Sequence, residues 1–238
     1  MNGTHMNIST STPQAVPAPI DHHVSVAGKK TLSGPTRKVI DIATRMFHWL
    51  FALSFVGAYV TAESESLRLL HVTLGYTMAG LLVYRLVWGL IGPRHARLSV
   101  LVRKLSGTPD WLRSLRSVKT LSDIKWQQGQ NILMALAVAA LLLAVIPITL
   151  TGYATYNEWG GKWLQHIHEA VGEFYLFLVI VHLVLIALLS LFRWKNQAMP
   201  MLTGRISGSG PDLIKKDYKV IGILLLMGVL GWWISQFN

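Results

Sequence analysis

The 238-residue chain contains no cysteine. Disulfides, iron–sulfur clusters and covalently attached c-type haem all require thiols, so their absence excludes all three. A redox cofactor in this protein would have to be held by histidine, and the chain has nine histidines.

Charged residues are also scarce, at 14% of the chain, and the 11 acidic residues are outnumbered by 22 basic ones. Hydrophobic residues make up 52%, and the mean hydropathy of +0.42 is typical of a membrane protein rather than a soluble domain. The basic residues follow the loops instead of forming one patch, which argues against nucleic acid as a partner and for membrane lipid.

Long apolar runs account for most of the sequence. A run of about twenty apolar residues is enough to cross the hydrocarbon core of a bilayer. We therefore expect an all-α integral membrane protein with five spans, at residues 42–61, 67–91, 131–150, 164–192 and 220–235.

The basic residues predict the orientation of these spans. Nineteen of the 22 lie at residues 29–45, 94–125 and 193–219. The positive-inside rule then places the N-terminus in the cytoplasm and, with five spans, the C-terminus on the other side of the membrane. Four tryptophans would form an outer interfacial belt, namely Trp159, Trp163, Trp232 and Trp233.

The first 38 residues are rich in Ser, Thr, Pro and Ala and lack the apolar core of a signal peptide. We expect a disordered cytoplasmic tail in which His22 and His23 are incidental. His95, in a basic loop, is expected to be a surface residue.

Four histidines lie inside the apolar segments, where polar side chains are costly and usually functional. On the predicted topology His48 and His182 lie near the cytoplasmic side and form the inner pair. His71 and His168 lie near the other side and form the outer pair. His168 and His182 are fourteen residues apart on one helix, a rise of about 21 Å that returns close to the same face.

Two imidazoles that face each other across a helix bundle suit a b-type haem, which takes one axial nitrogen on each side of the iron. Zinc would require more ligands at each level. His166 points away from the face shared by His168 and His182, so His168 is the better outer candidate.

Two further residue types fit a bound haem. Gly75 and Gly172 each follow an outer histidine by four residues and leave room for a flat macrocycle, although they could equally serve close helix packing. Arg45 and Arg85 lie at the inner level and could bind propionates, or could simply snorkel as topology anchors. Arg68 and Lys162 are weaker outer candidates.

Four short motifs resemble those of the bacterial cytochrome b561 family, which includes the b-type subunits of nickel–iron hydrogenases. The similarity covers about residues 40–206. The motifs are Arg45-Met-Phe-His48-Trp, Leu70-His71-Val-Thr-Leu-Gly75-Tyr, Tyr84-Arg85-Leu-Val-Trp88-Gly-Leu-Ile-Gly92-Pro-Arg94-His95-Ala-Arg97 and Leu164-Gln-His-Ile-His168-Glu.

The resemblance implies a four-helix bundle at residues 39–206 that holds two non-covalent haem b groups, with His48 and His182 at one iron and His71 and His168 at the other. Residues 207–238 would then be a linker and an additional C-terminal transmembrane helix. Family members pass electrons between the quinone pool, such as ubiquinone, and periplasmic redox partners that are commonly c-type cytochromes. One branch oxidises superoxide. Whether this chain is itself a quinone-linked oxidoreductase or only an electron carrier stays open at this point.

Glu169 and Glu173 are positional candidates for a proton acceptor at a quinol site, although carboxylates near a helix N-terminus are also favoured by the dipole. Two readings from other classes remain: a haem-free membrane scaffold, and a proton-coupled transporter that uses the intramembrane histidines as a relay.

Overall fold

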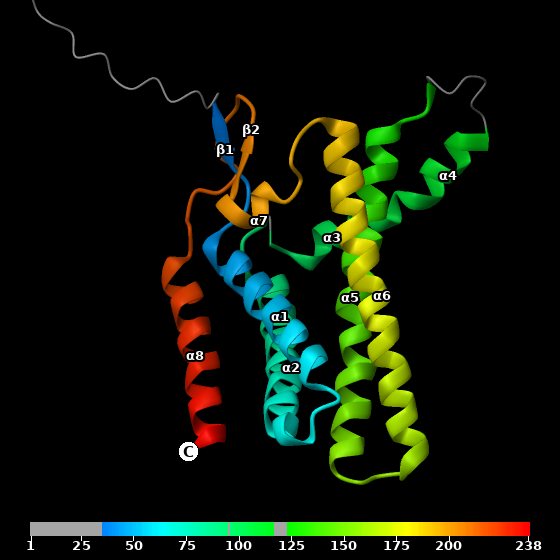
Figure 1. Ribbon diagram of the computed structural model, residues 1–238. Coiled ribbons are helices and arrows are strands. Elements are labelled where there is room, and N and C mark those ends of the chain that lie inside the picture. Colours follow the sequence, from blue (N-terminus) through cyan, green and yellow to red (C-terminus); the bar gives the residue numbers. More distant parts are fainter. Residues whose placement is uncertain (1–34, 95, 117–122) are drawn as a thin grey trace, which may run out of the picture. The chain divides into compact units, whose positions relative to one another are not determined.

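The computed structural model describes residues 35–94, 96–116 and 123–238, and most of these are helical (Figure 1). Most of the predicted tail, with His22 and His23, lies outside the described residues, as does His95. The long helices are α1 (Ile42–Thr61), α2 (Arg68–Ile91), α5 (Trp126–Tyr156), α6 (Lys162–Arg193) and α8 (Lys219–Phe237). The shorter elements are β1 (Thr36–Lys38), η1 (Glu65–Leu67), α3 (Leu98–Ser106), α4 (Thr108–Arg116), α7 (Met199–Thr203) and β2 (Arg205–Ser207).

All five apolar segments of the sequence form helices. Four stretches of the described residues are long and apolar enough to cross a membrane: Glu65–Ile91, Trp126–Tyr156, Lys162–Arg193 and Lys219–Phe237. The helix α1 does not belong to this set because Arg45 and His48 reduce its apolar character. It packs against both α2 and α8, so protein rather than lipid covers much of its surface.

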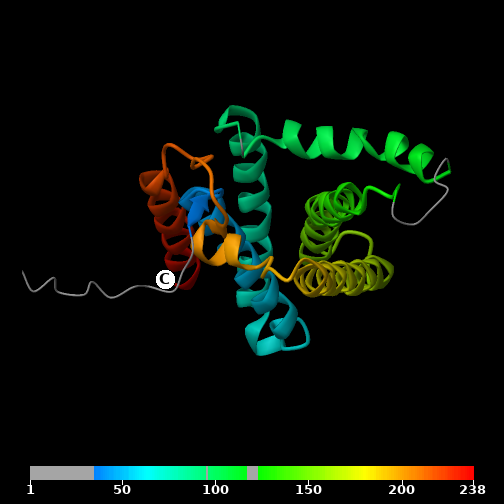
Figure 2. The ribbon, with the colours of Figure 1, turned by 90° about the horizontal axis from the view of Figure 1, so that it is seen from above.

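The long helices form two antiparallel hairpins, α1–α2 and α5–α6, which meet chiefly where α2 packs on α5. Viewed from above, α8 and the α5–α6 hairpin lie on opposite sides of the α1–α2 hairpin, and α3 and α4 run across the bundle instead of along it (Figure 2). The end of α8 and the turns that close both hairpins lie at the same end of the molecule (Figure 1).

The start of α1 is fixed by a capping interaction. The fully buried Asp41 accepts a hydrogen bond from the backbone N–H of Thr44 at 2.7 Å and another from the Thr44 hydroxyl at 3.1 Å. A side-chain carboxylate at this position satisfies a backbone donor that the helix leaves unpaired. His48 therefore follows at a defined position, two turns into the helix.

A small antiparallel sheet joins segments far apart in sequence. The strand β1 pairs with β2, with Arg37 opposite Ile206. Lys38 forms an ion pair with Asp217, and its backbone N–H donates to Asp212. The segment predicted to be a disordered tail therefore ends in an ordered strand that lies beside the chain leading into α8.

The helix α8 is seated on α1 and α2 through two contacts. A Cβ at Gly222 would lie 3.0 Å from the Ile42 side chain and 3.2 Å from that of Met46, so glycine permits a close approach of the two helices. The indole N–H of Trp233 donates to the Thr77 hydroxyl at 2.9 Å.

The core at mid-depth joins both hairpins. It contains Phe55 of α1, Met78 of α2, Val145 of α5 and Tyr175 of α6, all buried. Because Tyr175 is seven residues from both His168 and His182, this layer lies between the two levels at which the histidines occur.

Candidate functional site

The outer histidines come from the two hairpins and face each other. The ring centres of His71 on α2 and His168 on α6 are 6.1 Å apart, and the ring planes are nearly perpendicular at 86°. Two imidazoles that bind one metal ion from opposite sides, through bonds of about 2 Å, have ring centres about 6 Å apart. The spacing of the outer pair therefore fits a shared metal ion.

Hydrogen bonds determine which nitrogen of each outer histidine is available. Nδ1 of His71 lies 2.8 Å from the backbone oxygen of Ala58, which can only accept, so Nδ1 carries the proton. Nδ1 of His168 lies 3.1 Å from the Thr151 hydroxyl, which itself donates to Pro147 O at 2.7 Å. That hydroxyl must accept from His168, so both rings keep the Nε2 lone pair for a metal.

The inner pair also consists of one histidine from each hairpin. His48 of α1 and His182 of α6 are close enough to interact electrostatically. The Nδ1 atom of each ring is buried and has no hydrogen-bond partner among the described residues. Buried imidazole nitrogens without partners are costly unless they bind something else, such as a metal ion.

The donor set favours haem over a bare metal ion. Among the described residues, no group of three or more His, Asp or Glu side chains could hold a metal ion. Pairs of histidines at two depths are too few for zinc but match the two nitrogen donors that would hold a b-type haem.

The glycines near the outer pair leave space beside the histidines. A Cβ added at Gly75 or Gly172 would meet nothing within 4 Å, whereas one at Gly152 would lie 2.9 Å from Cε1 of His168. Gly75 and Gly172 thus border open space that a flat group could fill. Gly152 permits the observed position of the His168 ring.

The two arginines predicted at the inner level contact backbone carbonyls. Arg45 donates through Nε to Met201 O at 3.3 Å and also to Leu202 O, at the C-terminal end of α7. Arg85 donates through Nη1 to Ala96 O at 2.9 Å. Each guanidinium has further donors beyond these contacts.

The other candidates lie on the surface. Glu169 accepts hydrogen bonds from Gln165 at 3.0 Å and interacts with His166 at 3.4 Å, and Glu173 is exposed. Arg68 is exposed and lies near Glu65, at 3.4 Å. Lys162 is also exposed, so neither of the weaker outer cations is held against the outer histidine pair.

The sequence analysis did not identify Ala58, Thr151 and Gly152. Ala58 acts through its backbone oxygen, one of the last four carbonyls of α1, which lack the usual N–H partner four residues further along the helix. The same oxygen also accepts from the Thr61 hydroxyl at 3.2 Å. Because the hydrogen bond to His71 uses only this backbone oxygen, the residue type at position 58 does not indicate it. Thr151 could have been found, because α5 runs antiparallel to α6 and its end approaches the start of α6.

Comparisons with known proteins show the family to which the chain belongs. A model of the prokaryotic cytochrome b561 family matches residues 39–204. A protein of Rhizobium leguminosarum bv. viciae, described as a probable Ni/Fe-hydrogenase B-type cytochrome subunit, is 26% identical over 157 residues, which cover 57% of this chain and 66% of the relative. The match thus spans just under two thirds of that relative's length. No solved structure matches the chain. The match over most of the chain shows that this multi-pass membrane protein belongs to the prokaryotic cytochrome b561 family.

Proposed function

We propose that this protein is a di-haem b-type cytochrome that carries electrons between the quinone pool and a periplasmic redox partner such as a c-type cytochrome. The observation that carries the proposal is the pair formed by His71 and His168, with ring centres 6.1 Å apart and both Nδ1 atoms engaged in hydrogen bonds. The second pair, His48 and His182, supports a second haem.

His48 and His182 would hold the inner haem, and His71 and His168 would hold the outer haem. A bound haem would supply one-electron transfer. Because two imidazoles would hold each haem, small molecules such as oxygen would be kept from the iron. Ala58 O and the Thr151 hydroxyl would orient the outer imidazoles and raise their basicity.

Gly75 and Gly172 would provide clearance for the outer haem. Arg85 is the better candidate for an inner propionate, because Arg45 already donates to two carbonyls of α7. Both arginines retain donors that could form charge-assisted hydrogen bonds with a carboxylate.

The membrane topology is also part of the proposal. With α1 counted as a span, five helices would place the N-terminus in the cytoplasm and the C-terminus in the periplasm of the inner membrane. The basic residues of α3, α4 and the β1–β2 region lie at one end of the molecule, opposite the hairpin turns (Figure 1). This asymmetry supports the proposed orientation. Glu169 and Glu173 would lie at the periplasmic face, where they are candidates for a proton acceptor at a quinol site.

The test is a reduced-minus-oxidised visible spectrum with a pyridine haemochrome count on detergent-purified protein. The wild type should contain two b haems per chain, and His48→Ala and His71→Ala should each lose one. His166→Ala is the matched control, because His166 is an exposed histidine two residues from a proposed ligand, and it should keep both haems. A haem-free wild type, or two haems in both ligand variants, would refute the proposal and favour a scaffold or a proton-coupled transporter.

A further inference from the structure

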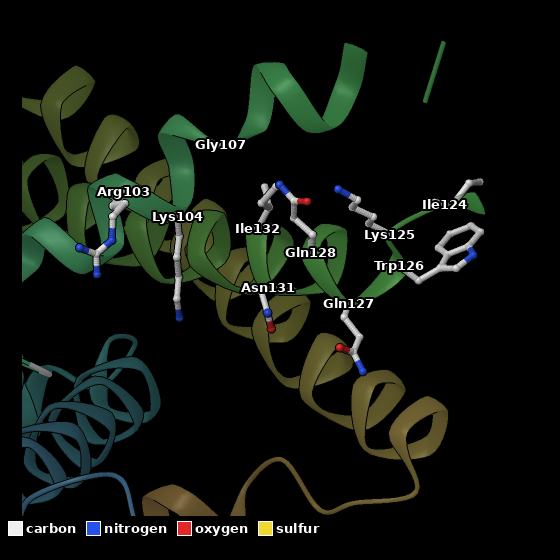
Figure 3. A pocket seen from close by; sticks show the side chains of 10 residues that line it. All are labelled: Arg103, Lys104, Gly107, Ile124, Lys125, Trp126, Gln127, Gln128, Asn131 and Ile132. Carbon is white, nitrogen blue, oxygen red and sulfur yellow. The ribbon is translucent and has the colours of Figure 1, made fainter. Parts of the chain in front are cut away.

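A second candidate site lies apart from the histidines, where the junction of α3 and α4 crosses the start of α5. It is a pocket of about 720 Å³, within the size range of small-molecule sites. Figure 3 shows Arg103 and Lys104 of α3 at one side of the pocket and Lys125, just before the first turn of α5, at the other side.

The pocket carries charge of one sign. Of the ten described residues that line it, three are basic and none is acidic. Within the described part of the chain, Arg103, Lys104 and Lys125 form no ion pair. Their mutual repulsion is unfavourable unless an anion is bound nearby.

The amide side chains present further donors. Arg193 donates to Asn131 Oδ1 at 3.0 Å. A guanidinium cannot accept, so this contact fixes the oxygen of Asn131 toward Arg193 and leaves its NH₂ group for the pocket. The Nε2 atom of Gln128, another lining residue, lies near Gly107 at the α3–α4 junction, 3.8 Å from where a Cβ would stand.

The start of α5 adds to the positive potential. Lys125 occupies its N-cap position, no side chain caps the helix, and its first turn contains no acidic residue. A lysine at the positive end of a 31-residue helix opposes the dipole, whereas an anion at this position would be stabilised by it.

The position of the pocket at the start of α5 favours a membrane lipid as the source of the anion. Trp126, which lines the pocket and is 55% exposed, is the first residue of a membrane-spanning segment. Tryptophan at the end of a span is typical of the headgroup level of a bilayer. Ile132, one and a half turns further along α5, adds an apolar surface on the side of the pocket that continues along the span.

We infer that this pocket binds the headgroup of an anionic phospholipid, attracted by the positive charge of Arg103, Lys104 and Lys125. Basic pockets beside transmembrane helices are suited to such headgroups. Phosphatidylcholine, which carries no net charge, would bind weakly. The inference does not depend on the haem assignment.

Native mass spectrometry of the detergent-purified full chain tests this inference. Phosphatidylglycerol and phosphatidylcholine of identical acyl chains are titrated separately, and retained lipids are counted. Wild type should retain one phosphatidylglycerol in preference to phosphatidylcholine. The triple variant Arg103→Gln, Lys104→Gln, Lys125→Gln should bind phosphatidylglycerol at least about tenfold more weakly.

The control removes the same charge from the same end of the molecule but outside the pocket, with Arg113→Gln, Lys215→Gln and Lys216→Gln. It should keep the wild-type affinity. Equal weakening in both variants, or equal retention of the two lipids by wild type, would overturn the inference. Displacement of the lipid by inorganic phosphate at equal concentration would overturn the lipid as the source, because it would show a site for soluble anions.

If the triple variant lacks the wild-type helical circular dichroism, Lys125→Gln replaces it and Lys125→Arg serves as its conservative partner. Weakening in the first variant with recovery in the second supports the inference. Unchanged binding in both overturns it.

Discussion

The rings of Phe55 and Tyr175 lie 4.8 Å apart, centre to centre, and connect α1 to α6 across the bundle. Tyr175 is only 1% exposed and Phe55 is 6% exposed. Close approach of α1 to α6 is otherwise limited, since α1 packs mainly on α2 and α8 and α6 mainly on α5. The two rings thus act as a spacer between the hairpins, midway between the two histidine levels.

Removing this spacer should destabilise the protein. Tyr175→Ala leaves a cavity at a site where the chain cannot easily collapse, and we expect a loss of about 3–5 kcal/mol in the free energy of unfolding. Tyr175→Phe, which keeps the ring, should lose much less. The measurement is thermal unfolding in detergent, followed by circular dichroism.

Phe177→Ala is the control for this prediction, because Phe177 is on the same helix and is 58% exposed. It should unfold close to the wild-type temperature. If it lowers that temperature as much as Tyr175→Ala does, the mid-depth layer is not the structural core that we describe.

The hydroxyl of Thr151 should govern the outer haem. Thr151→Val removes the acceptor for His168 Nδ1 with little change of shape, and loss of a hydrogen bond to a metal-binding histidine typically costs about 10–100-fold in affinity for the bound group. We expect the outer haem to dissociate more readily while the inner haem stays bound. A haemochrome count after graded washing with a haem-binding competitor measures this.

Thr149→Val provides the comparison on the same helix. The Thr149 hydroxyl donates to the carbonyls of Val145 and Ile146, at 2.8 and 3.2 Å, and forms no hydrogen bond with a histidine within the described part of the chain. Its variant should retain both haems. Equal retention in the two valine variants would show that the Thr151 contact does not support the ligand.

The helix bounds predicted from the sequence lie close to the observed bounds, and the differences have physical causes. The predicted range 42–61 coincides with α1, but α5 extends beyond the predicted residues 131–150 at both ends. Its first turns contain the polar residues Gln127, Gln128 and Gln130, so a search for runs of apolar residues does not include them. Gln130 is nevertheless fixed by Arg193, 63 positions away, which donates to it at 2.7 Å.

The α3 and α4 helices and the β1–β2 sheet were not predicted. The two helices are nine residues each and rich in basic residues, so in sequence they look like a charged loop. The sheet pairs Thr36 with Ser207, and a local sequence pattern cannot indicate a strand partner that lies so far away in the sequence.

The histidine pairs were predicted from depth along each helix, which follows from residue number, and the structure places the ring centres of His71 and His168 6.1 Å apart. The partners of their Nδ1 atoms could not be predicted as readily. One is a backbone oxygen, and the position of the other depends on how α5 lies against α6.

The glycines beside the outer pair permit a test that separates packing from haem clearance. Gly75→Ala and Gly172→Ala each add a Cβ that meets no protein atom within 4 Å, and alanine within a helix is favoured over glycine by about 0.5–1 kcal/mol. If the glycines served close helix packing, the added methyl groups would clash with a neighbouring helix and both variants would be less stable than wild type even without haem. We expect instead that the apoprotein is not destabilised but the outer haem is bound more weakly, because the added methyl group occupies space that the macrocycle needs.

Gly231→Ala in α8, where a Cβ likewise meets nothing within 4 Å, is the control and should leave the haem content unchanged. Full retention of both haems by Gly75→Ala and Gly172→Ala would mean that the open space beside these glycines is not where the outer haem lies.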